Sequence, residues 1–385
     1  MTAAFIAHAV LFSSWAAHIP YVKAQLGLSD AALGTALFGA PVGSLLATLL
    51  SHWALPRWGS HRLVPITVAG YACVGVTVGL ATSGPLLFLA LALWGMFQGA
   101  LDVAMNTQAA TVERVAQAPI MSRFHGMWSV GALLGAVIGA GSVSAGIGLT
   151  AQLAVLGVVV LVVVEALTRH LIPDARPAAV DSDAGPAKRA WLNRTVAVLG
   201  AVAFASFLCE GAATDWSANY LHDVVGAGPG VSALSYAAYT LMMVVTRFGA
   251  LRLHSRVSAR RLLPALALLA AVGMSVTLAT AATPWASTVS VIGFAGLGAG
   301  VALLVPTAFS AAYSASSAGS AIALVATTGW VGYLLGPPLI GHLAGWVGLS
   351  AALITIPVMI SVAGAVIGCT GAFDAADEFH RDVMT

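Results

Sequence analysis

Charged residues are scarce in this sequence. Asp, Glu, Lys and Arg make up 8% of the 385 residues, whereas hydrophobic residues make up 59%. Soluble globular chains carry about 25% charged residues, so the composition excludes a water-soluble fold. The net charge of +2 is too small to indicate a nucleic-acid partner. The three cysteines all lie in apolar runs, which argues against a disulfide framework or a metal cluster.

Several motifs of energy-using and catalytic proteins are missing as well. No GxxxxGK[ST] motif occurs, and neither lysine, Lys23 or Lys188, follows a glycine. This argues against a transport ATPase. No nucleophile–base pair stands out, so we expect no enzyme activity, no catalytic residue, no metal and no cofactor. The first apolar stretch lacks a basic leader region, so we expect it to remain as a helix.

Long apolar runs, by contrast, recur along the whole chain. About 20 apolar residues span the hydrocarbon core of a bilayer, and the sequence predicts an all-α membrane protein with twelve transmembrane helices. The predicted spans are 3–22, 31–53, 63–82, 86–110, 124–144, 149–168, 195–221, 232–251, 263–282, 286–310, 319–342 and 348–370. Residues 169–194 form one long polar break and divide the spans into six plus six.

The basic residues predict the orientation of these spans. With both termini in the cytoplasm, all of the 16 Lys and Arg except Lys23 fall on the cytoplasmic side. The opposite orientation would place nearly all of them outside. Because cytoplasmic loops carry an excess of Lys and Arg, we expect both chain ends to be cytoplasmic.

The two halves of the chain resemble each other. RWGSHRLVP at 57–65 matches RVSARRLLP at 256–264 with a shift of 199, and VGALLG at 130–135 matches VGYLLG at 331–336 with a shift of 201. Two matches in the same order, at nearly the same shift, indicate an internal duplication.

Six plus six spans, parallel repeats and a basic loop after the second span resemble the major facilitator superfamily of secondary transporters. The resemblance implies two six-helix bundles, at 1–168 and 195–373, joined by a cytoplasmic linker at 169–194 and followed by a cytoplasmic tail at 374–385. It also implies a monomer in which the bundles rock around a solute site near the bilayer midplane. Of the loop motif of the family, Arg57, Gly59 and Arg62 are present, but Pro56 replaces its acidic residue.

Polar residues inside the fourth span predict where the solute binds. Gln98, Asp102 and Asn106 follow one another at intervals of four, which places them on one face of a helix. A charged side chain at the bilayer centre costs about 2.5–3.5 kcal/mol on insertion scales. We therefore expect this stripe to face the bundle interior, with Asp102 binding a proton or a substrate hydroxyl. A purely structural role, in which Asp102 fastens helices together, is the alternative.

The stretch GALDVAMNTQ, with FHGMWSVGALLG and EGAATDWSANYL, resembles the fucose/proton symporter branch and bacterial YbjJ-type inner-membrane proteins. The resemblance implies proton coupling at Asp102, a sugar contact at Asn106 and residence in a bacterial inner membrane. That branch also uses an aspartate in its first helix. Here His18 is the titratable residue near that place, as a proton carrier or as a hydrogen-bonded core residue, and we expect His8 at a helix end.

The seventh span adds two more carboxyl groups. Glu210 is predicted near the bilayer centre and in proton coupling, and Asp215 lies about 7.5 Å nearer the outside. Arg247 either snorkels or pairs with a carboxylate. The candidate substrate contacts are Gln98, Asn106, Asp215, Trp216, Asn219, Trp15 and Trp330, although tryptophans also anchor helices at membrane interfaces.

We therefore expect a secondary transporter that takes up a small polar solute, such as a sugar, together with protons by alternating access. A proton-driven exporter of drugs or metabolites is the alternative, since the ten methionines would suit adaptable binding. A membrane receptor or scaffold that transports nothing is a third hypothesis. The expected partners are the lipid bilayer, protons and the solute.

Overall fold

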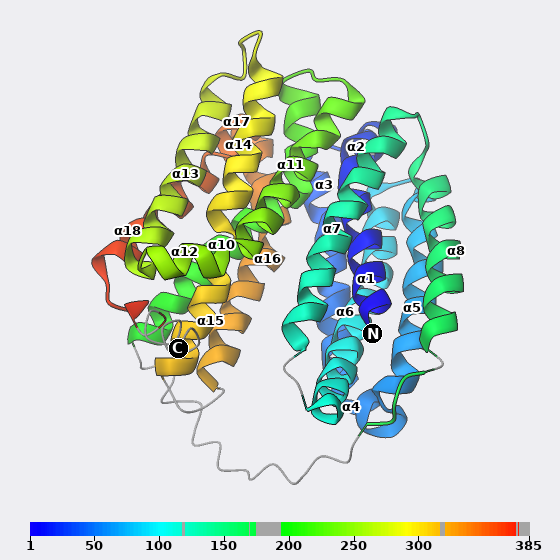
Figure 1. Cartoon of the computed structure of the whole chain (residues 1–385). Helices are drawn as coiled ribbons and strands as arrows, with labels where there is room; N and C mark the ends of the chain where they lie inside the picture. Colours follow the sequence, from blue (N-terminus) through cyan, green and yellow to red (C-terminus); the bar gives the residue numbers. More distant parts are fainter. Residues whose placement is uncertain (118–119, 169, 175–193, 316–319, 375, 377–385) are drawn as a thin grey trace. The chain divides into compact units, whose positions relative to one another are not determined.

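A computed structural model describes residues 1–117, 120–168, 170–174, 194–315, 320–374 and 376 (Figure 1). Within these ranges the regular secondary structure is entirely helical. Most of the predicted linker at 169–194 and of the predicted tail at 374–385 lies outside the described residues.

The helices follow the apolar runs of the sequence. The first half contains α1 (Thr2–Trp15), η1 (Ala16–His18), α2 (Ile19–Leu26), α3 (Asp30–Leu37), α4 (Gly39–Trp58), α5 (Ser60–Val78), α6 (Gly84–Ala116), α7 (Met121–Ser144) and α8 (Leu149–Thr168). The second half contains α10 (Arg194–Asn219), η2 (Tyr220–Val224), α11 (Pro229–Phe248), α12 (Ala250–Arg256), α13 (Ala259–Ala279), α14 (Ala286–Val301), α15 (Leu304–Ala315), α16 (Ser320–Val347), α17 (Leu349–Ala352) and α18 (Thr355–Cys369).

Eleven of the twelve predicted spans coincide with described helical stretches that are long and apolar enough to cross a membrane. The remaining predicted span, 319–342, is occupied by α16, which has 28 residues and contains Pro337 and Pro338. Lipid offers no hydrogen bonds to the backbone, so long helices are the natural conformation of such runs. The prediction of an all-α membrane protein is confirmed.

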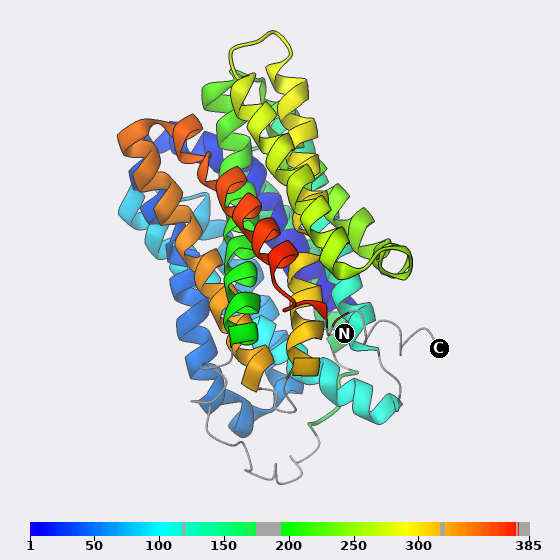
Figure 2. The same cartoon turned by 90° about the vertical axis from the view of Figure 1, so that its left-hand side faces the viewer.

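The chain divides into two compact units. The first comprises Met1–Ala178 and Gly228–Ala237, and the second comprises Ala179–Ala227 and Ala238–Thr385. In the second unit α10 packs along α16, and α13 packs along α14 and α18 (Figure 2). The predicted domain boundaries, which assign 228–237 to the second bundle, stay a prediction.

Glycines bring α1 and α7 of the first unit close together. A Cβ atom on Gly131 would lie 2.7 Å from the Ile6 carbonyl oxygen, and one on Gly135 would lie 2.5 Å from that of Val10. Small residues let helix backbones approach closely in lipid, where packing drives helix association. This contact holds α1 in a defined rotation inside the unit.

Candidate functional site

The polar stripe of α6 lies opposite the apolar side of that helix. Leu89 is 60% exposed and Leu93 is 41% exposed, as expected for side chains that face lipid. Gln98 and Asp102 each follow one of these leucines by nine residues, which is about two and a half turns of helix. They therefore point away from the lipid side and are half-buried. This arrangement agrees with the expectation that the stripe faces the interior.

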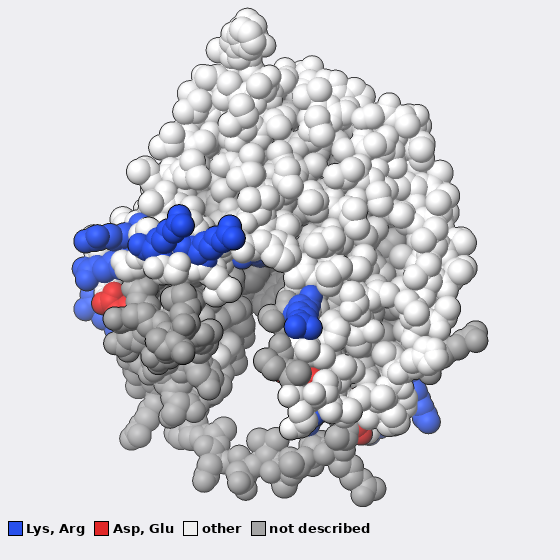
Figure 3. Space-filling view, in the orientation of Figure 1, with Lys and Arg blue, Asp and Glu red and all other residues white. Residues whose placement is uncertain are grey.

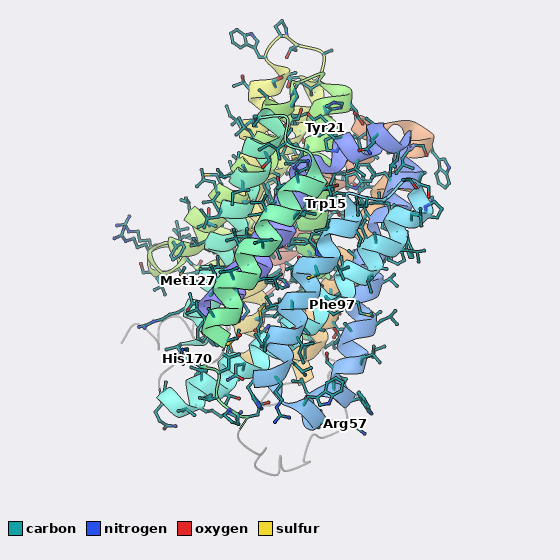
Figure 4. All side chains as sticks on the ribbon, turned by 90° about the vertical axis from the view of Figure 1, so that its right-hand side faces the viewer. Trp15, Tyr21, Arg57, Phe97, Met127 and His170 are labelled. Carbon is teal, nitrogen blue, oxygen red and sulfur yellow. The ribbon has the colours of Figure 1, made fainter. Side chains whose placement is uncertain are left out.

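Close packing fixes the rotation of α6. A Cβ atom on Gly95 would collide with the backbone of Ala40 in α4. On another side of α6, Trp94 Nε1 donates a hydrogen bond to the Tyr71 carbonyl oxygen of α5 at 3.0 Å. The two rings stack with centroids 5.1 Å apart. Phe97 packs over Gly70 of the same neighbour (Figure 4). Neighbours on two sides thus determine which face carries the stripe.

Asp102 and Asn106 contact each other along the stripe. Asn106 Nδ2 donates hydrogen bonds to the Asp102 backbone oxygen at 2.8 Å and to Asp102 Oδ1 at 3.1 Å. The second carboxyl oxygen makes no hydrogen bond within the described residues. It is therefore available to a proton, to water or to a hydroxyl group of a solute.

His8 is a residue whose environment the sequence did not reveal. It lies inside α1 and is only 4% exposed, so the expectation of a helix-end residue is wrong. Trp128 Nε1 donates a hydrogen bond to His8 Nδ1 at 2.9 Å. Because an indole nitrogen is only a donor, this bond requires the neutral imidazole with its proton on Nε2. The His8 ring also interacts with the backbone of Gln98, the first residue of the stripe on α6. Its buried Nε2–H meets no strict hydrogen-bond geometry within the described residues and is a candidate donor to a ligand.

His18 is a hydrogen-bonded core residue. His18 Nε2 and Gln152 Oε1 are 2.8 Å apart, and Gln152 Nε2 donates to the Ser14 carbonyl oxygen at 3.2 Å. Both His18 and Gln152 are buried. Trp15, a predicted solute contact three residues earlier in the chain, is also buried within the unit (Figure 4). These residues stabilise the interior of the first unit.

The carboxyl groups of α10 lie on different faces of the helix. Glu210 and Asp215 are five residues apart, which separates them by about 140° around the axis. Glu210 lies within electrostatic range of the Arg247 guanidinium, and Arg247 Nε donates to the Ala302 carbonyl oxygen at 3.3 Å. Arg247 is thus held near a carboxylate inside the second unit.

Unpartnered polar atoms gather at the end of α10, beside Asp215. Trp216 Nε1, Ser217 Oγ and Asn219 Oδ1 are buried and make no hydrogen bond within the described residues. Asn219 Nδ2 donates to the Asp215 backbone oxygen at 3.0 Å. A π-helical turn, Tyr220–Val224, follows directly, and such turns occur often at functional sites. Buried groups without partners carry a cost that a ligand or water can relieve.

Trp330, the other predicted tryptophan contact, is more than half exposed. Its ring stacks on Phe207 at 5.8 Å and meets the edge of Tyr333 at 5.7 Å. The second unit also contains an apolar cavity of about 470 Å³ between α10, α16 and α18. None of the predicted site residues lines it.

The basic loop of the first unit receives a carboxylate from a distant part of the chain. Gly59 adopts φ 73°, which favours glycine, at the start of α5. Arg57 lies over the Trp53 ring at 4.3 Å from its centroid, and Figure 4 shows it at the end of the unit opposite Tyr21. Asp174 accepts a hydrogen bond from Ser60 N at 2.6 Å and another from the Ser60 hydroxyl. Asp174 therefore supplies a negative charge at the start of α5, although Pro56 occupies the acidic position of the loop motif.

The profile of the Major Facilitator Superfamily matches residues 1–316. The chain belongs to the major facilitator superfamily. It is 31% identical over 357 residues to an uncharacterized MFS-type transporter of Yersinia pestis, covering 91% of this chain and 89% of the relative. It is 33% identical over 367 residues to an uncharacterized transporter of Sinorhizobium fredii, covering 92% and 96%.

Solved structures show the same fold. The nucleoside transporter NupG superposes with a TM-score of 0.74 at 15% identity, over 95% of this chain and 96% of NupG. A D-xylose-proton symporter superposes with a TM-score of 0.71 at 13% identity, over 95% and 96%. The chain is a multi-pass membrane transporter rather than an enzyme. The finer resemblance to the fucose symporter branch stays a prediction.

Proposed function

We propose that this transporter carries a small, neutral, polyhydroxylated solute, such as a sugar or a nucleoside, together with protons by alternating access. The observation that carries the proposal is the stripe of Gln98, Asp102 and Asn106 on the side of α6 opposite the lipid-facing leucines. Amide and carboxyl groups of this kind bind hydroxyl groups by hydrogen bonds.

The distribution of cations supports a neutral solute. Every Lys and Arg in the described membrane-crossing helices lies within three residues of a helix end, whereas Asp102 and Glu210 lie deep inside theirs. Arg247 lies within electrostatic range of Glu210 and already offsets that carboxylate, so an anionic solute would carry an unpaired buried charge, which is costly in the membrane. Carboxyl, amide, indole and imidazole groups suit hydroxyl-bearing molecules instead. The two structural neighbours are a nucleoside transporter and a D-xylose-proton symporter, and nucleosides and xylose are solutes of this chemistry.

The carboxyl groups supply the proton coupling. An ionised side chain at the bilayer centre is unfavourable unless it is paired or solvated. A proton bound by Asp102 or Glu210 removes this charge while the site is closed to water. The solute then occupies the remaining hydrogen-bonding groups, and both are released on the other side of the membrane.

Proteoliposomes test the proposal directly. Purified protein is reconstituted around the pH-sensitive dye pyranine, and D-xylose, L-fucose and uridine are added outside in turn. We expect solute-dependent acidification with at least one of them, and its loss in Asp102→Asn. Asp223→Asn is the matched control, because Asp223 forms a partly exposed pair with His222 at 2.7 Å.

No proton movement with any of the three solutes would contradict the proposal, as would equal flux in Asp102→Asn. Acidification that requires the solute on the inside, with protons moving against it, would identify an exporter instead.

A further inference from the structure

A group of exposed arginines follows the apolar helix α11 in the second unit. Arg252, Arg256, Arg260 and Arg261, here called the arginine patch, occupy α12 and the start of α13. All four are exposed, and Figure 3 shows a band of basic side chains on this face of the second unit. The sequence contains no Asp or Glu between Asp223 and Asp374. None of the four makes an ion pair within the described residues.

The orientation of α12 turns two of these arginines outward. Thr307 Oγ1 and His254 Nε2 are 3.3 Å apart, which anchors one side of α12 to α15. Ala250, Leu253 and His254 are half-buried on that side. Leu251, Arg252, Ser255 and Arg256 form the opposite, exposed side. Arg252 and Arg256 are one turn apart, and like charges at this spacing repel each other unless an anion lies between them.

An apolar track leads along α11 to the patch. Leu241, Val245 and Phe248 are exposed at helical spacing, and Leu251 continues the track onto α12. Phe248 is 70% exposed and Leu251 is 64% exposed. Phe248 ends a membrane-crossing helix, so the track enters the bilayer while α12 begins two residues later. An acyl chain beside a phosphate group matches this sequence of apolar and then basic surface.

We propose that the arginine patch and the apolar track form a binding site for one anionic phospholipid. Arg252 and Arg256 bind its phosphodiester, with Arg260 and Arg261 beside them, and an acyl chain lies along Phe248 and Leu251. Guanidinium groups bind phosphate oxygens through parallel charge-assisted hydrogen bonds. Basic clusters next to a membrane helix are a recurrent means of anionic lipid recognition.

The positive-inside bias explains the sign of these charges but not their arrangement. The bias is satisfied by arginines at any position in a cytoplasmic loop. The other loop of the repeat shows the difference. There Arg57 lies over the ring of its own Trp53 and donates to the Trp53 carbonyl oxygen at 2.9 Å. In the patch, Arg260 Nε donates to the Gly368 carbonyl oxygen at 3.4 Å. The exposed Arg252 and Arg256 side chains make no hydrogen bond within the described residues and lie beside exposed apolar residues.

Native mass spectrometry of the 385-residue chain with added lipid tests the site. The probes are phosphatidylglycerol, phosphatidylcholine with the same acyl chains, and inorganic phosphate. The patch variant is Arg252→Gln with Arg256→Gln. The matched control is Arg57→Gln with Arg62→Gln, which removes the same charge from the corresponding loop. Thermal unfolding in detergent establishes that each variant is folded.

We expect one phosphatidylglycerol to bind to the wild type, with affinity about tenfold or more lower in the patch variant and unchanged in the control. Phosphatidylcholine should bind weakly, and millimolar phosphate should not displace the lipid. Equal losses in both variants, equal binding of both lipids or displacement by phosphate alone would overturn the proposal. If the patch variant fails to fold, single Arg252→Lys and Phe248→Ser variants take its place. Unchanged lipid affinity in both of these variants would also overturn the proposal.

A chain truncated after Ala376 tests another occupant. The removed residues 377–385 contain three carboxyl side chains and one arginine. If the patch binds this tail rather than lipid, only the truncated chain will bind phosphatidylglycerol, and the proposal is wrong for the 385-residue chain. Equal lipid affinity with and without the tail supports the lipid site.

Discussion

Asp174 offers a sharp test of how the first unit is held together. Its carboxylate accepts hydrogen bonds from Ser60 N at 2.6 Å, from the Ser60 hydroxyl and, at 3.4 Å, from Thr111 Oγ1. One residue earlier than Pro173, the Ile172 carbonyl oxygen accepts from Gln108 Nε2 at 3.0 Å. The short segment after α8 is therefore fastened to the start of α5 and to the C-terminal part of α6.

The size of the expected stability loss follows from the capping side chain that the Asp174 carboxylate replaces. The α5 N-cap residue is Gly59, which has no side chain to bond the first N–H groups. Removing a capping side chain costs about 0.5–2 kcal/mol, and a negative charge at a helix N-terminus contributes about 0.3–1 kcal/mol. We expect Asp174→Ala to lower the unfolding free energy by about 1–2 kcal/mol. Asp174→Asn keeps an acceptor but loses the charge, so its loss should be smaller.

Thermal unfolding in detergent, followed by tryptophan fluorescence, measures these differences. Asp374→Ala is the matched control, because Asp374 lies 200 residues later in the duplicated chain and its carboxylate accepts no hydrogen bond within the described residues. An unchanged midpoint in Asp174→Ala would refute the reasoning. So would an equal decrease in Asp374→Ala.

Three further changes test the interior of the first unit. Gly95→Ala should destabilise by about 1–3 kcal/mol, because its Cβ collides with the backbone of α4, whereas Gly141→Ala, with open space around it, should not; thermal midpoints compare the two. Gln152→Leu should cost about 1–3 kcal/mol by leaving His18 without its partner, and Gln152→Glu, which keeps an acceptor, should restore part of the loss by the same measurement. His8→Asn keeps an acceptor for Trp128 but removes the donor at the Nε2 position, so it should raise the KM for a transported solute several-fold in flux assays. His8→Gln keeps a donor at that position and should raise the KM less; equal KM values in the two variants would assign His8 a structural role alone.

Hydropathy and spacing determined much of this protein without a structure. The membrane class and eleven of the spans follow from apolar runs of a length that only a bilayer requires. The superfamily was expected from the resemblance of its repeats and basic loop, and the family profile confirms it. The stripe on α6 followed from its spacing of four, because helix periodicity is local and does not depend on neighbouring elements. The roles of Asp102 and Glu210 remain predictions, because both depend on a solute and a proton.

The tertiary structure decided which side chains meet. Asp174 reaches Ser60 across 114 positions of sequence, and Trp128 reaches His8 across 120. Glycine contacts of α7 fix the rotation of α1, and this rotation buries His8. From the sequence one can derive which residues share a helix face and that a charged residue in lipid is unfavourable. The partner of each polar group is determined by the packing of one helix on another. This packing depends on contacts between residues far apart in the chain.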